Sequence, residues 1–226
     1  MSRTVYGFVI AVILAASSAA IAAPAAPDKA DTATPAAAPA AKRKPPTPPR
    51  GIESYLKAAF KALNGKQPKE AGVAVRQAVE SLKQGGAKAE GKSKQELESA
   101  DKGLARLAER LEQGKEVPAT EMRKAFAETH LALAQVARDE TYQQWMKKDT
   151  KKSGKAMLAE IGHVARAAEW SEQKLDKAEK NTLKEARAIA GKSAKGEQVN
   201  QGDADKAWND VGDVLKKVGR GAPATK

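Results

Sequence analysis

The chain has 226 residues, with 40 lysines and arginines against 28 aspartates and glutamates, so its formal net charge is +12, and it contains no cysteine. The absence of cysteine excludes a disulfide scaffold, a thiol enzyme and a cysteine-based zinc site. Only one long apolar run occurs in the sequence, which excludes a polytopic membrane protein. The length suits a single domain with flanking segments.

The first 22 residues have the composition of an export signal. Arg3 is followed by an apolar run over residues 5–14, and the small-x-small pattern of a signal-peptidase site occurs at residues 20–22. This order predicts a secretory signal peptide over residues 1–22. We therefore expect an exported protein, either periplasmic or secreted. The alternative is a protein tethered by an uncleaved N-terminal helix, since residues 5–23 are mostly apolar.

Residues 23–50 predict a disordered linker rich in alanine and proline. This segment holds eight of the eleven prolines and ten alanines, and no apolar side chain larger than alanine or proline. Such a composition cannot bury enough apolar surface to form a core, and dense proline favours an extended polyproline conformation.

From residue 51 onward, apolar residues recur with the helical period of about 3.6. One face of the first segment carries Ile52, Tyr55, Leu56, Ala59, Phe60 and Leu63. The same periodicity predicts further helices over residues 68–85, 93–114, 118–152, 154–191 and 203–219. A capping box of Ser93 and Glu96 is expected to start the third helix, and Ser153 with Gly154 to separate the fourth from the fifth.

No stretch alternates apolar and polar residues as a strand would. The prediction is an all-α domain over residues 51–220, built as an up-and-down bundle or as stacked helix hairpins of about six helices. One helix, near 154–191, is expected to be long. Residues 221–226 are expected to form a disordered tail.

Residues 56–82, LKAAFKALNGKQPKEAGVAVRQAVESL, resemble a helix pair of the tetratricopeptide type. Small residues recur at Ala59, Ala71 and Ala78, and a short polar turn joins the two apolar stripes. The resemblance implies antiparallel helix pairs. It implies neither a repeat array nor a peptide-binding function, because the Leu-Gly and closing proline signatures and a clean 34-residue period are absent.

Residues 86–93, GAKAEGKS, match the phosphate-loop pattern G-x-x-x-x-G-K-[ST] by their letters. A phosphate loop follows a buried strand, whereas this segment follows an amphipathic helix, so we interpret it as a glycine-rich loop between helices. No HExxH, GxSxG or pair of histidines at i, i+4 occurs. The sequence therefore predicts no enzyme, no catalytic residue and no cofactor.

His130 and His163 are the two histidines of the chain. If the fourth and fifth helices turn near residue 150, His130 faces Trp170 and lies about seven residues out of register with His163. This offset corresponds to ~10 Å along the helices, whereas two ligands of one metal ion both lie ~2 Å from it. We therefore expect packing or polar roles for both histidines, and no metal or haem site.

The strongest local signal is the lysine-rich stretch at the turn between the fourth and fifth helices. Its members are Lys147, Lys148, Lys151, Lys152 and Lys155, with Trp145 beside them. Lysines at a helix N-terminus oppose the helix dipole, so helix stability does not favour them there. They suggest an anion-binding site; the alternative is a solvated tip that keeps the protein soluble.

These observations favour an exported, non-enzymatic helical module for protein–protein interaction or scaffolding in the cell envelope, with a protein partner or self-association. The alternative is a basic binder of an anionic envelope polymer or lipid surface through the 147–155 turn. Nucleic acid is not expected as a partner, because export removes the protein from cytoplasmic DNA. Lysine and glutamate alternate along most helices, as in KAEKNTLKEAR, which favours the first interpretation.

Overall fold

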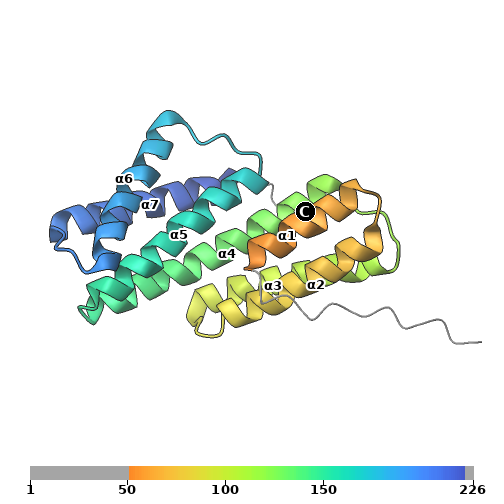
Figure 1. Cartoon of the computed structure of the whole chain (residues 1–226), viewed down its shortest axis with the longest axis horizontal. Coiled ribbons are helices and arrows are strands. Elements are labelled where there is room, and N and C mark those ends of the chain that lie inside the picture. The colour runs from red at the N-terminus through yellow and green to blue at the C-terminus, as the bar shows by residue number, and fades with distance from the viewer. Residues whose placement is uncertain (1–50, 222–226) are drawn as a thin grey trace, which may run out of the picture. The chain divides into compact units, whose positions relative to one another are not determined.

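The computed structural model describes residues 51–221, and the regular structure of this part is entirely helical (Figure 1). The all-α prediction is confirmed. The seven helices are α1 (Ile52–Asn64), α2 (Pro68–Gly85), α3 (Gly91–Glu112), α4 (Ala119–Met146), α5 (Thr150–Trp170), α6 (Lys177–Lys195) and α7 (Gln201–Gly221). None of these described helices has the length and apolar character that a membrane crossing requires. The predicted signal peptide, linker and residues 222–226 of the tail lie outside the described residues.

The long helix α4 is shared by two groups of helices (Figure 1). Helices α1 to α3 pack against its first half around a core that includes Leu56, Leu104 and Phe126. Helices α5 to α7 pack with its second half around a core that includes Ile161 and Val211. Since burying one such side chain contributes about 1.5–3 kcal/mol, each core holds its helices together mainly through apolar contact.

The prediction of one long helix over 154–191 is wrong in one respect, because this stretch is divided between α5 and α6. Just after α5, Glu172 has a left-handed backbone with φ of 58°. The side chain of Asp176 then accepts a hydrogen bond from the Glu179 amide at 2.8 Å, and the Glu179 carboxylate accepts one from the Asp176 amide at 2.7 Å. This capping box starts α6. No glycine or proline marks the break, so the apolar periodicity alone did not reveal it.

The boundary between α4 and α5 also differs from the prediction. The turn lies at residues 147–149, with Lys148 in the left-handed region at φ of 59°. Asp149 caps α5 by accepting a hydrogen bond from the Lys152 amide at 3.0 Å. Ser153 and Gly154, expected to break the helix, lie buried inside its first turns.

Gly154 is buried because α5 approaches α6 closely at this position. A Cβ atom there would lie 2.5 Å from the amide nitrogen of Ala194 and 2.7 Å from the carbonyl oxygen of Ala190. Both neighbours belong to the backbone of α6, so no side-chain rotation could relieve the clash. Gly154 therefore serves helix packing and does not interrupt the helix.

Residues 86–90 join α2 to α3, and residues 91–93 already belong to the first turn of α3. This segment follows a helix and not the strand that a phosphate loop needs. The N-cap of α3 is Glu90, and Ser93 lies inside the first turn, where its hydroxyl donates to the Glu90 carbonyl at 2.9 Å. The predicted capping box of Ser93 and Glu96 is therefore wrong.

Candidate functional site

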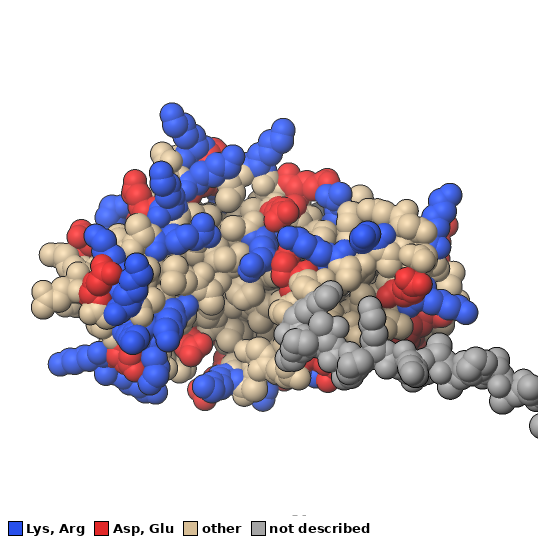
Figure 2. Space-filling model, in the orientation of Figure 1, with Lys and Arg blue, Asp and Glu red and all other residues tan. Residues whose placement is uncertain are grey.

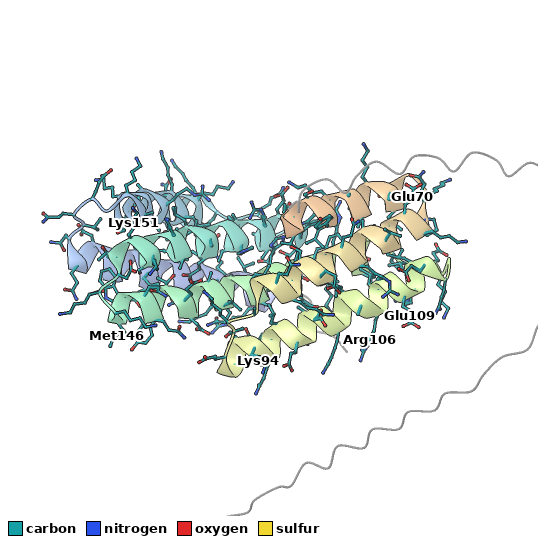
Figure 3. All side chains as sticks on the ribbon, turned by 60° about the horizontal axis from the view of Figure 1, so that its bottom comes forward. Glu70, Lys94, Arg106, Glu109, Met146 and Lys151 are labelled. Carbon is teal, nitrogen blue, oxygen red and sulfur yellow. The ribbon has the colours of Figure 1, made fainter. Side chains whose placement is uncertain are left out.

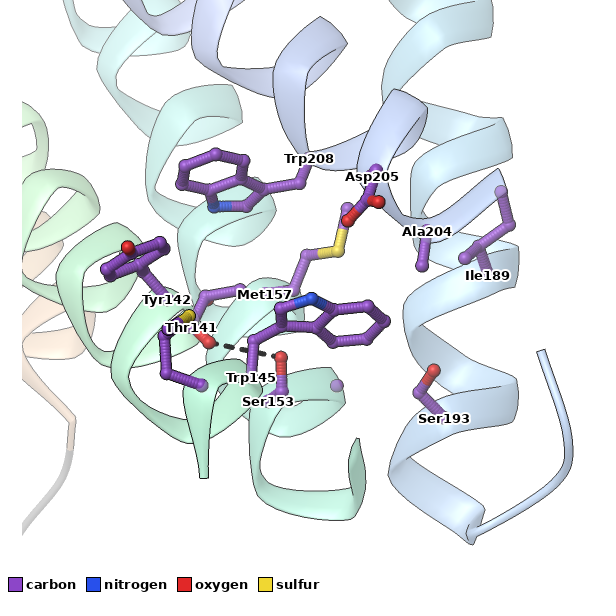
Figure 4. A pocket seen from close by; sticks show the side chains of 12 residues that line it. Thr141, Tyr142, Trp145, Ser153, Met157, Ile189, Ser193, Ala204, Asp205 and Trp208 are labelled. Carbon is purple, nitrogen blue, oxygen red and sulfur yellow. Dashed lines mark hydrogen bonds between the residues drawn. The ribbon is translucent and has the colours of Figure 1, made fainter. Parts of the chain in front are cut away.

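A pocket of about 240 Å³ opens at the end of the helices where α4 turns into α5 (Figure 4). Residues from α4, α5, α6 and α7 line it, so it forms only when all four helices are packed. Three aromatic side chains, Tyr142, Trp145 and Trp208, contribute to its wall. The lining is mostly apolar, and its only charged side chain is that of Asp205.

The last turn of α4 supplies the accessible edge of this pocket. Tyr142, Trp145 and Met146 are spaced i, i+3 and i+4, which places them on one side of the helix. Tyr142 is 51% exposed and Met146 is 64% exposed. Among the described residues, the one other large apolar side chain with such exposure is Val73 on α2, at 54%. Two of the three large apolar side chains that are exposed within residues 51–221 therefore lie beside one pocket.

The inner part of the pocket consists of Met157 from α5, Ile189 from α6 and Ala204 from α7. The hydroxyl of Ser153 donates to the Thr141 carbonyl at 3.2 Å, shown as a dashed line in Figure 4. The hydroxyl of Thr141 donates to the carbonyl one turn earlier in α4, at 2.8 Å. These two hydroxyls therefore serve contacts between and within the helices.

Trp208 connects the pocket to a buried ion pair. Its ring stacks on Tyr142 with centroids 6.0 Å apart, and the Arg138 guanidinium lies 4.0 Å from its centroid. Arg138 also donates to the Trp208 carbonyl and to the carboxylate of the fully buried Glu160, both at 2.9 Å. Burial raises the pKa of Glu160 to about 7, although the Arg138 charge opposes this shift. The aromatic wall is thus held by charge-assisted hydrogen bonds.

The lysines of the 147–155 turn are all exposed at the same end of the molecule; Figure 3 shows Met146 and Lys151 there, with Glu70 and Glu109 at the opposite end. The Lys152 ammonium lies 2.9 Å from the Asp149 carboxylate, and this contact raises the pKa of Lys152. Asp149 thus already provides a carboxylate at the N-terminus of α5. Within the described part of the chain, no carboxylate oxygen lies within 4.0 Å of the ammonium groups of the other four lysines, which are Lys147, Lys148, Lys151 and Lys155.

The structure places Trp145, the sixth residue of the predicted anion site, in the wall of the pocket beside this turn. Sequence reasoning missed the pocket itself. The available signal was the spacing of Tyr142, Trp145 and Met146 in the last turn of α4. Met157, Ile189 and Trp208 gave no separate signal, because each continues the apolar stripe that packs its own helix.

Glu53, His130, His163 and Trp170 form a polar cluster between the two cores. Its geometry shows that the predicted offset of seven residues between the two histidines is wrong. The Nδ1 atoms of His130 and His163 are 3.0 Å apart, and His130 Nε2 lies 2.7 Å from the Glu53 carboxylate. The Trp170 indole N–H donates to the same carboxylate at 3.4 Å. The α4–α5 turn is centred on Lys148, so the offset between the histidines is about three residues and not seven. Two imidazole side chains span that offset.

The pKa values of His163 and Glu53 are consistent with a structural role for this cluster. Burial, and next the neighbouring His130, lower the pKa of His163 to about 3. Burial alone would raise the pKa of Glu53, but hydrogen bonds from His130 and Lys57 outweigh it and hold the pKa at about 2. An ionised Glu53 on α1 is thereby joined to α4 and α5. No group of three or more potential metal ligands occurs among the described residues.

Acidic and basic side chains are interleaved over most of the face shown in Figure 2, and blue side chains also gather at the lower left, where Figure 1 places the α4–α5 turn. Protein-family models, curated proteins and solved structures give no match to this chain. Its function must therefore be inferred from the pocket, the lysine turn and the distribution of charge.

Proposed function

We propose that this chain is an exported, non-enzymatic helical module that binds a protein partner in the cell envelope. Its binding surface is the pocket together with the exposed Tyr142 and Met146, which we call the pocket surface. The observation that carries the proposal is this apolar pocket with an exposed apolar edge. Protein interfaces obtain most of their binding energy from a few side chains that enter such well-packed apolar pockets.

Two further features support a protein partner. The mixed charges on the face in Figure 2 resemble an ordinary soluble surface more than a continuous basic face for a polyanion. The pocket is also framed by aromatic and methionine side chains, which are enriched at protein interfaces. A non-enzymatic role is supported by the lining, where the Ser153 and Thr141 hydroxyls donate to backbone carbonyls and Asp205 is the only charged side chain.

The test is affinity capture from a cell-envelope extract with the mature chain as bait. Met146→Gln changes an exposed side chain of the pocket surface and should abolish capture of the partner. Val73→Gln changes a similarly exposed apolar side chain on α2 and should leave capture intact. Sedimentation of the purified chain identifies the case in which the partner is a second copy. Equal capture by both variants would contradict the pocket surface as the binding site.

The second candidate is binding of an anionic polymer or lipid surface through the 147–155 turn. It is favoured by five exposed lysines within nine residues. Exposed charges of this kind give binding that weakens strongly with added salt. Protein binding through the pocket depends mainly on apolar burial and should respond much less to salt.

A further inference from the structure

We propose that the occupant of the pocket surface is an acidic peptide segment of the partner. One large apolar side chain of this segment enters the pocket, and its carboxylates lie against the lysine turn. This inference rests on the proposed function and specifies the chemistry of the partner. It follows from three features: the size of the pocket, the lysines that adjoin its lining residues in the sequence, and the position of Asp205, the one carboxylate in the lining.

The volume of the pocket suits one side chain. At about 240 Å³ it exceeds an apolar cavity of about 150 Å³ that binds benzene. It falls below the range of about 300–1,000 Å³ that is typical of pockets for complete small-molecule ligands. A phenylalanine, leucine or methionine side chain therefore fits, with the rest of the ligand outside.

The lysines are chain neighbours of the residues that line the pocket. Met146 is followed directly by Lys147, and the lining residues Ser153 and Gly154 lie between Lys152 and Lys155. An anchor in the pocket therefore places its flanking residues within reach of several ammonium groups. Of these, only Lys152 is paired with a carboxylate in the described part of the chain.

Asp205 makes the site asymmetric. It lines the pocket from α7 and is exposed, so it would repel a carboxylate on that side. The lysines come from the α4–α5 turn. The acidic residues of the partner should therefore lie toward the turn and away from α7.

The test uses three blocked pentapeptides: EDFDE, EDADE, which lacks the anchor, and QNFNQ, which lacks the charge. Binding is followed by NMR through the indole N–H signals of the three tryptophans. Trp145 and Trp208 line the pocket, whereas Trp170 packs between Phe60 and Phe126 in the other core and serves as an internal reference. We expect EDFDE to shift the signals of Trp145 and Trp208 and not that of Trp170.

The dissociation constant of EDFDE should be at least about tenfold lower than that of EDADE, because a phenyl ring is buried. At low salt it should also be about fivefold lower than that of QNFNQ, and this difference should shrink at 0.5 M salt. Lys147→Gln combined with Lys155→Gln should weaken the binding of EDFDE without affecting the binding of QNFNQ. The control pair Lys94→Gln and Lys102→Gln should change the affinity for neither peptide. Asp205→Asn should lower the dissociation constant of EDFDE about twofold.

Each other result overturns the inference in a different way. Equal affinities of EDFDE and QNFNQ would show that the partner segment need not be acidic, and only the apolar pocket would remain as the binding site. Vesicles of phosphatidylglycerol that shift Trp145 and Trp208 when EDFDE does not would assign the surface to lipid. No shift with any probe would overturn peptide anchoring in the pocket, while capture with Met146→Gln decides the proposed function independently.

Discussion

The Nδ1 atom of His130 lies 3.0 Å from the Nδ1 atom of His163, so α4 and α5 meet through two imidazoles that face each other with the same atom. A hydrogen bond between two such nitrogens requires a hydrogen on one and a lone pair on the other. Glu53 holds the far nitrogen of His130 at 2.7 Å and so ties α1 to this pair. A polar network of this kind between two apolar cores specifies the register of the helices that it connects.

The first prediction concerns pH. The contribution of His163 to the free energy of unfolding should fall as pH is lowered from about 6.5 toward 4.5, because the unfolded chain then protonates His163 while the folded chain keeps it neutral down to about pH 3. The slope from this residue is at most about 1.4 kcal/mol per pH unit. Glu53, with a folded pKa of about 2, adds stability above about pH 4.5 that is lost below it. Glu160, with a folded pKa of about 7, contributes with the opposite sign, because the folded chain protonates it at a higher pH than the unfolded chain does. The contributions of Glu160 and His163 are similar in size, so the stability of the unaltered chain should change little between about pH 6.5 and 4.5.

Urea denaturation followed by circular dichroism between pH 4.5 and 7 separates these contributions. The His163→Gln variant should become more stable as pH falls, because only the Glu160 contribution remains, and the Glu160→Gln variant should become less stable, because only the His163 contribution remains. If the His163→Gln variant showed the same pH slope as the unaltered chain, the neutral state of His163 in the fold would be disproved.

The second prediction concerns the ion pair of Arg138 and Glu160. Arg138→Met removes the partner of a carboxylate that is 0% exposed and should cost about 3–5 kcal/mol at pH 8. The loss should be smaller at pH 5, where Glu160 is protonated. Combining Arg138→Met with Glu160→Gln should recover much of the stability, because no buried charge then remains. Equal losses at both pH values, without recovery in the double variant, would show that packing of Arg138 on Trp208 dominates.

The sequence revealed most of the fold because helix formation here follows local patterns. The apolar stripes of α1, α2 and α7 run along single faces, and glycine ends α2 where expected. The breaks around α5 were misplaced for a physical reason. Lys148 and Glu172 adopt left-handed conformations that glycine usually adopts, while Gly154 lies inside a helix at a position where α6 leaves no space for a Cβ atom. Which glycine or lysine takes which role depends on contacts between helices.

The third prediction compares two glycines of α5. Gly154→Ala should destabilise the protein by about 1–3 kcal/mol, because the new methyl group meets the α6 backbone. Gly162→Ala should stabilise it by about 0.5–1 kcal/mol, since only the Arg166 guanidinium lies nearby, at 3.5 Å, and alanine favours the helix. Thermal melting of both variants is the measurement. A stabilised Gly154→Ala variant would contradict the close approach of α5 and α6.

The candidate site was only partly predictable. The lysine turn is contiguous in the chain and could be recognised directly, and Trp145 was placed beside it. The pocket combines Tyr142, Met157, Ile189 and Trp208 from four helices, and no local pattern reports which helix ends meet. The histidine pair was missed because the turn was predicted two residues too far along the chain. In an antiparallel pair of helices, that error shifts the residue expected to face a given position by four.

The fourth prediction tests the lysine turn as an anion site. Changing Lys151, Lys152 and Lys155 to Gln should leave the helical content intact, because all three side chains are exposed. Sedimentation with phosphatidylglycerol vesicles should show weaker binding than for the unaltered chain if the turn is the site, and binding should weaken steeply with salt. A control with Lys94, Lys102 and Lys184 changed to Gln removes the same charge elsewhere. Equal effects of the two triples would mean that only net charge matters.

The central claim is that the pocket surface binds a protein in the cell envelope, and photo-crosslinking in living cells tests it most directly. Met146→p-benzoylphenylalanine places a reactive ketone at the exposed edge of the pocket, and Val73→p-benzoylphenylalanine places the same group at a comparably exposed position on α2. We predict one discrete protein adduct, or a dimer of the chain itself, from position 146 and none from position 73. Adducts with lipid alone at position 146, or the same protein adducts from both positions, would contradict the claim.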